Sequence, residues 1–150
     1  MGERLLQLGL GDEHLMTTLA SKTGISGRAA LIVRDDREFV SAQSAAANAG
    51  VLIETNVLID VLPFDGNSFD VAIAHGTAWP LAECYRVLRA GGRLVVLEPG
   101  KRTGMSGWFR PAAAAPPSGD AAAALQGAGF GSVRLLADRE GYRFTEAFKR

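Results

Sequence analysis

Short apolar runs alternate with amphipathic segments along most of the chain. The runs have the pattern of parallel strands that are buried on both faces. They predict strands at 5–8, 29–33, 71–74 and 94–97, with 51–57 as a less regular candidate. Between the runs, apolar residues recur at helical spacing, which predicts helices over 12–22, 35–47 and 81–88. This alternation predicts an α/β fold, doubly wound around a mostly parallel sheet with helices on both faces.

The end of the chain has a different pattern. Glycine, proline, alanine and serine dominate residues 100–119, a stretch longer than an ordinary connection. A short alanine-rich helix is predicted at 120–126. Two more apolar stretches flank a turn at 138–141 and predict a C-terminal antiparallel hairpin; they span 132–137 and 142–148. Together the elements predict a single domain over residues 1–150.

Composition and charge narrow the classes of function. Sixteen basic residues balance sixteen acidic ones, so no net field attracts nucleic acid or an anionic membrane. No apolar run approaches the roughly 18 residues that a membrane span needs, and the N-terminus lacks a signal-peptide pattern. The single cysteine fits a reducing compartment, so a cytoplasmic location is expected. His14 has no metal-ligating residue one helical turn away, and no metal site is expected.

The segment from Leu62 to Pro99 has the most specific pattern in the chain. In order along it stand Leu62-Pro63-Phe64, Phe69-Asp70, Glu83, Arg86-Val87-Leu88 and Gly91-Gly92. This ordered run resembles the second half of the class I S-adenosylmethionine-dependent methyltransferases, especially the small-molecule type related to the quinone-biosynthesis enzymes. The resemblance implies a Rossmann-like methyltransferase fold, S-adenosylmethionine as the cofactor and a small-molecule acceptor. The glycine pair is expected to end the preceding helix in a left-handed cap.

The resemblance also implies which residues hold the cofactor at the first strand-to-helix turn. The family has an acidic residue and three glycines there, and this chain has Gln7, Gly9, Gly11 and Glu13 at those positions. The two glycines let the backbone approach the methionine and ribose parts of the cofactor. Gln7 can accept a hydrogen bond but cannot offset the cofactor's positive charge. A tight structural turn would use the same glycines, so a purely structural role stays open.

Two aspartates are candidates for holding the adenosine part of the cofactor. Asp35 follows the second predicted strand, roughly 20 residues beyond the glycines, which is the spacing expected for ribose recognition. The alternative is that Asp35 caps the N-terminus of the next helix. The family's adenine-binding aspartate corresponds to Leu58 here, and the resemblance leaves Asp60 as the candidate substitute.

A methyltransferase must align its acceptor and, when needed, remove a proton from it. His75 follows the strand at 71–74, at the edge of the sheet where ligands bind in such folds. Its ordinary pKa near 6.5 suits a general base; the alternative is a histidine that satisfies loop backbone groups. Trp79 and Trp108-Phe109 are candidates for an apolar acceptor pocket, with simple packing as the alternative. The N-P-P-Y-type sequence of nucleic-acid methylation is absent.

The sequence therefore leaves two possible functions of different classes. The first is an S-adenosylmethionine-dependent methyltransferase that acts on a small apolar or phenolic acceptor. The second is a catalytically inactive methyltransferase-like domain that serves in binding or assembly, which Gln7, Glu13 and Leu58 favour because they replace family residues. The second function implies a protein partner or a homodimer.

Overall fold

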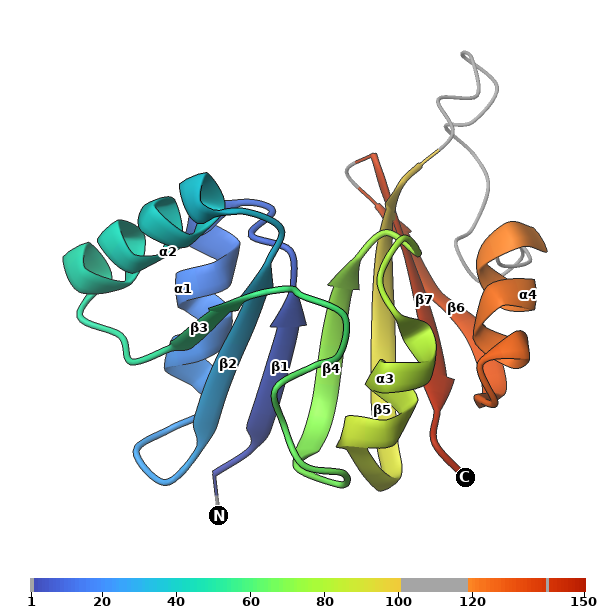
Figure 1. The fold of residues 1–150 in the computed structure, drawn as a ribbon. Helices are drawn as coiled ribbons and strands as arrows, with labels where there is room; N and C mark the ends of the chain where they lie inside the picture. Colours follow the sequence, from blue (N-terminus) through green and yellow to red (C-terminus); the bar gives the residue numbers. More distant parts are fainter. Residues whose placement is uncertain (1, 101–118, 140) are drawn as a thin grey trace.

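The computed structural model describes residues 2–100, 119–139 and 141–150, and its sheet has the strand order β3-β2-β1-β4-β5-β7-β6 (Figure 1). The strands are β1 (Arg4–Leu8), β2 (Arg28–Val33), β3 (Glu54–Val57), β4 (Phe69–His75), β5 (Leu88–Pro99), β6 (Gly131–Arg139) and β7 (Tyr142–Phe148). The helices are α1 (Glu13–Lys22), α2 (Asp36–Ala49), α3 (Leu81–Val87) and α4 (Gly119–Gly127). No helix in the described ranges is long and apolar enough to cross a membrane.

The sheet confirms the predicted α/β fold with its mostly parallel strands. β1 to β5 pair in parallel, and β7 lies antiparallel between β5 and β6. The C-terminal antiparallel hairpin is therefore present. The candidate strand at 51–57 is shorter than predicted, because only Glu54–Val57 pairs with β2.

Alternate residues of β2 enter two separate cores. In β2, Ala30 and Ile32 belong to the core under α3 and α4, whereas Leu31 and Val33 belong to the core under α1 and α2. This is the two-residue periodicity of a strand that is buried on both faces. Cys84 of α3 lies in the first core, as predicted, and burial raises the pKa of its thiol to about 12.

Gly91 and Gly92 do not end a helix, so that prediction was wrong. α3 ends at Val87, and β5 begins at the next residue and includes both glycines. Gly91 has a φ of +74° and donates its N–H to the Lys149 carbonyl. A Cβ atom on Gly92 would lie 2.8 Å from the Arg89 carbonyl oxygen. Gly91 suits its position because of its positive φ, and Gly92 suits its position because a side chain there would meet backbone atoms.

Other residues of the family pattern form a latch between the loop before β4 and helix α3. Arg86 donates to the carbonyl oxygens of Phe64, at 2.8 Å, and Leu62, at 3.1 Å. It also pairs with Glu83 at 2.7 Å, and Glu83 accepts the Leu62 N–H. The Arg86 hydrogen bond and the Leu62 N–H lower the pKa of Glu83. We call these contacts the Glu83–Arg86 latch; it holds the Leu62–Phe64 loop against α3.

Asp70 joins the first residues of β4 to β1 and β5. Its carboxylate accepts the backbone N–H of Arg4 at 2.8 Å, the Arg4 guanidinium, and Nε of Arg89. The Arg4 side chain is the main reason that the pKa of Asp70 lies well below its usual range, and the Arg4 N–H and Arg89 add to the effect. The unprotonated carboxylate is therefore the form that stabilises this edge of the sheet.

Asp70→Asn is expected to lower the free energy of unfolding at pH 7 by about 1 kcal/mol, because it removes charge-assisted hydrogen bonds at a partly exposed site. Asp70 has a lower pKa in the folded chain than its ordinary value of about 3.9. Its contribution is therefore complete above that value and is lost as the pH falls. Urea unfolding of both proteins at pH 7 and pH 3 should show the difference narrowing at pH 3. A difference that stays constant would contradict the assignment.

Candidate active site

The candidate residues meet at the carboxyl ends of β1 and β4, where the strand order reverses. The chain leaves β1 toward β2 on one side and leaves β4 toward β5 on the other. Such a crossover opens a crevice outside the sheet, which is where ligands bind in folds of this type. Gly9 and Gly11 follow β1, Asp35 precedes α2, and His75 ends β4. The structure therefore brings these four residues to one edge.

The glycine turn after β1 is built as the sequence predicts. Gly9 and Gly11 have φ angles of +93° and +55°, which favour glycine. The Gly9 N–H donates to the Ile32 carbonyl at 2.8 Å. Asp12 then caps α1 by accepting the Leu15 N–H at 2.9 Å. The chain thus turns from strand to helix within a few residues and keeps the glycine backbone at the crevice.

Gln7 is almost fully buried beneath this turn, with 1% of its surface exposed. Its amide Nε2 faces the carbonyl oxygens of Gly9, at 3.3 Å, and Leu10, at 3.4 Å. A carboxylate at this position would face the same oxygens and be repelled by them, so an amide suits this turn. Gln7 Oε1 is buried and has no hydrogen-bond partner among the described residues. Buried acceptors without a partner are rare in folded proteins.

His75 lies against Gln7 and is partly buried. Burial lowers the pKa of its imidazole, so the ring is neutral at pH 7. Its Nε2 is 3.5 Å from Gln7 Nε2, and that amide nitrogen is a donor because it also faces two carbonyl oxygens. Nε2 of His75 is then the acceptor, which places the proton on Nδ1. His75 can serve as a general base only after it leaves Gln7.

Asp35 is exposed and caps helix α2, the alternative role expected for it. Its Oδ1 accepts the Glu38 N–H at 2.9 Å, and the Glu38 carboxylate accepts the Arg34 N–H at 2.9 Å. The cap uses one carboxylate oxygen and leaves Oδ2 without a partner in the described part of the chain. Capping and ribose binding therefore do not exclude each other, and the ribose role stays a prediction.

Asp60, Leu58 and Glu13 are the remaining positions of interest for the cofactor site. Asp60 is exposed, in the loop after β3. Leu58 donates its N–H to the Val33 carbonyl and packs on the core. Glu13 accepts the Ser41 hydroxyl of α2 at 2.5 Å. This contact holds Glu13 between the helices, and it does not fill the crevice.

Trp79 belongs to the loop that follows β4 and packs into the core. It is buried, with 4% of its surface exposed, and its Nε1 donates to the His75 carbonyl at 3.0 Å. The guanidinium of Arg34 lies over its ring, 4.5 Å from the ring centre. Packing, the alternative role, is thus the one the structure shows. Trp108-Phe109 lie outside the described residues.

An apolar cavity of about 480 Å³ adjoins the glycine turn. Leu15 and Leu19 of α1 form one side, and Tyr142 and Phe144 of β7 form the other. His75 lines it too. Sequence reasoning missed the two aromatic residues, although their spacing on β7 places them on one face of the strand. The sequence could not show that this face of β7 lies on the same side of the sheet as α1, with β4 and β5 between them.

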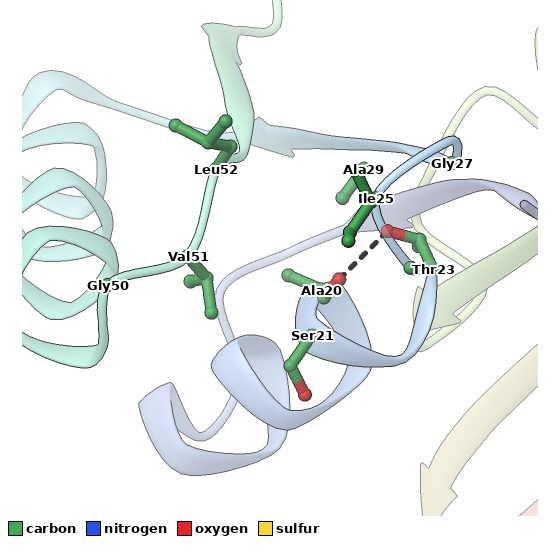
Figure 2. Close-up of a pocket in the computed structure, with 10 residues that line it drawn as sticks. Ala20, Ser21, Thr23, Ile25, Gly27, Ala29, Gly50, Val51 and Leu52 are labelled. Atoms are coloured by element: carbon green, nitrogen blue, oxygen red, sulfur yellow. Dashed lines mark hydrogen bonds between the residues drawn. The ribbon is translucent and has the colours of Figure 1, made fainter.

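A second hollow, of about 420 Å³, lies at the opposite edge of the sheet (Figure 2). The end of α1, the turn before β2 and the segment after α2 surround it, and Ile25 and Leu52 are among its residues. The residues that line it are apolar or small and include no titratable side chain. It therefore lacks the groups that acid–base chemistry needs.

Comparison with known proteins agrees with this geometry. A family described as methyltransferase domain matches residues 6–96. The ubiquinone/menaquinone biosynthesis C-methyltransferase UbiE of Stenotrophomonas maltophilia (strain R551-3) is 31% identical over 120 residues, a match that covers 73% of this chain and 47% of that protein. The chain thus spans about half the length of this curated relative.

Solved structures share the fold at lower identity. A SAM-dependent methyltransferase from Aquifex aeolicus has a TM-score of 0.81 and 19% identity, over 99% of this chain and 83% of that chain. The [4+2]-cyclase SpnF has a TM-score of 0.72 and 21% identity, over 99% of this chain and 74% of that chain. These likenesses show the fold alone. The match to the methyltransferase domain confirms the resemblance seen in the sequence: the chain belongs to the class I S-adenosylmethionine-dependent methyltransferase family, whose cofactor is S-adenosylmethionine.

Proposed function

We propose that this chain transfers a methyl group from S-adenosylmethionine to a small apolar or phenolic acceptor. The observation that carries the proposal is the position of His75, which borders both the glycine turn and the apolar cavity. A cofactor-binding turn and an acceptor cavity that share one residue can bring two small molecules together. The UbiE relative, a C-methyltransferase of ubiquinone/menaquinone biosynthesis, supports an acceptor of this chemistry.

The residues at the site carry the chemical groups that S-adenosylmethionine needs. The backbone of Gly9 and Gly11 can approach it closely, and Asp35 Oδ2 can accept from ribose hydroxyls. Gln7 Oε1 is a buried acceptor without a partner among the described residues, which suits a ligand that carries a positive charge. When bound, S-adenosylmethionine supplies an activated methyl group on a sulfonium.

The chain's own residues then have three tasks in the reaction. Tyr142 and Phe144 hold the acceptor by apolar and ring contacts in the cavity. Burial of the acceptor there excludes water and orients it for an in-line displacement. His75, neutral at pH 7 and released from Gln7, accepts the proton that a phenolic acceptor gives up.

Asp35→Ser separates the two roles of Asp35. Serine is as good an N-cap as aspartate, so the melting temperature should stay close to that of the natural protein. Its single hydroxyl cannot accept from two ribose hydroxyls, and we expect the affinity for S-adenosylmethionine to fall by about tenfold or more, the effect of losing a charged hydrogen-bond partner. Isothermal titration calorimetry with S-adenosylmethionine and with its demethylated product measures the change.

Asp36→Ser is the matched control, because Asp36 is the exposed neighbour that begins α2. It should leave the affinity unchanged. Equal affinities for the natural protein and Asp35→Ser would remove Asp35 from the cofactor site. No heat with either ligand would overturn the proposed activity and return the chain to the alternative, an inactive domain that serves in binding or assembly.

A further inference from the structure

Two of the chain's own side chains, His75 and Trp79, cover the glycine turn; we call them the plug. A Cβ atom on Gly11 would lie 2.3 Å from Cε1 of the His75 ring. A Cβ atom on Gly9 would lie 3.1 Å from Cζ2 of Trp79 and 3.2 Å from Cβ of His75. The space that these glycines leave open by having no side chain is thus occupied by the protein itself.

The plug is held in place from the opposite side of the crevice. Arg34, the residue after β2, stacks on Trp79 with its guanidinium 4.5 Å from the ring centre. The Arg34–Trp79 contact joins the end of β2 to the loop after β4 across the carboxyl end of β1, which lies between the two strands. Gln7 holds His75 from beneath through the contact between their Nε2 atoms, at 3.5 Å. Each plug residue therefore has its own restraint.

The loop that carries Trp79 has a natural point of rotation. Gly76 follows His75 directly, has a φ of +83°, and has no atom within 4 Å of its Cβ position. Its N–H donates to the Leu97 carbonyl, so the end of β4 stays fixed while the residues beyond it turn. A change of backbone angles at one glycine can carry Trp79 away from Gly9; the strands keep their pairing, and the bond from Trp79 Nε1 to the His75 carbonyl breaks.

We infer that the plug is an autoinhibitory gate: the nucleoside cofactor binds only when residues 76–80 withdraw Trp79 from the glycine turn and the His75 side chain rotates away from Gly11. This inference rests on the proposed function, since it concerns the same cofactor site. The described conformation is the closed state, with Arg34 as its clamp. Because the cofactor binds only the open state, its apparent affinity is reduced by the fraction of molecules that are open. Weakening the clamp must then tighten cofactor binding.

Arg34→Ala tests the gate, and Arg37→Ala is the matched control. Both residues are exposed arginines near the start of α2, but only Arg34 contacts Trp79 among the described residues. A Trp108→Phe background leaves Trp79 as the single tryptophan, so its fluorescence reports on the gate alone. Two quantities are measured in each variant: acrylamide quenching of Trp79 without ligand, and the affinity for S-adenosylhomocysteine by calorimetry.

The gate predicts that Arg34→Ala raises ligand-free quenching of Trp79 and tightens binding of S-adenosylhomocysteine by about two- to fivefold, the effect of losing an exposed cation–π contact in the closed state. Arg37→Ala should change neither quantity. Addition of S-adenosylhomocysteine to the Trp108→Phe background should also raise the quenching of Trp79, because binding exposes it.

Weaker binding in Arg34→Ala, or quenching of Trp79 that does not rise on binding, would overturn the gate while leaving the proposed function intact. Absence of heat in every variant would instead overturn the proposed function. In that case the quenching measured without ligand still tests whether Arg34 restrains Trp79. Equal quenching in Arg34→Ala and Arg37→Ala would show that Arg34 does not hold Trp79 against the glycine turn.

Discussion

Arg86→Ala is expected to lower the free energy of unfolding by about 2–3 kcal/mol, because it breaks the Glu83–Arg86 latch. The guanidinium donates to the Phe64 and Leu62 carbonyl oxygens and to the Glu83 carboxylate. After its removal, the partly buried carboxylate of Glu83 keeps only the Leu62 N–H among the described residues, and the carbonyl oxygens lose a charged donor. The loop before β4 then loses its attachment to α3.

Urea unfolding at pH 7 measures this loss, with Arg37→Ala as an exposed arginine control. Arg86→Lys should recover less than half of the stability, because one ammonium group cannot reach all three acceptors in the way that the planar guanidinium does. Arg86→Ala with the stability of Arg37→Ala would show that the latch adds nothing to the fold. The latch would then be a result of the fold and would not hold it together.

Gly27→Ala is expected to lower the free energy of unfolding by about 3 kcal/mol or more, although Gly27 has no role in the candidate active site. A Cβ atom there would lie 2.1 Å from the Thr23 carbonyl oxygen and 2.7 Å from the Glu3 carbonyl oxygen. Both obstacles are backbone atoms, which cannot move aside as a side chain can. The turn would have to open, and the hydrogen bonds from Gly27 N–H to Gly24 and from Arg28 N–H to Glu3 would weaken.

Gly127→Ala is the control for this prediction. Gly127 ends α4, and nothing lies within 4 Å of its Cβ position, so alanine should be neutral or slightly stabilising there. The melting temperatures of the two variants should differ by about ten degrees, since about 1 kcal/mol shifts the midpoint of a domain of this size by about 2–4 degrees. Equal midpoints would contradict the steric argument.

The residues that carry the family resemblance are largely structural. Arg86, Glu83 and the Leu62–Phe64 loop form the latch, Asp70 ties three strands together, and Gly92 allows a close backbone approach. Each is required by the packing of one segment on another, and none of them lines the apolar cavity. This is why the sequence indicated the family and the fold but left the acceptor open.

The sequence by itself determined the order and type of the elements, because strand and helix periodicities are local. It placed Gly9, Gly11, Asp35 and His75 correctly at strand ends, and parallel strands bring their carboxyl ends to one edge. It also named the cap of α2 as the alternative role of Asp35, and that cap is present.

Only the tertiary structure decided what occupies the crevice between those residues. The contacts of His75 with Gly11, and of Trp79 with Gly9 and Arg34, join segments that are distant in the chain. They depend on β4 lying beside β1 and on the path of the loop after it, and neither is a property of local sequence. The same holds for the face of β7 that carries Tyr142 and Phe144. Which side chains fill a space between strands is set by the packing of the whole sheet, because each side chain takes the room that its neighbours leave.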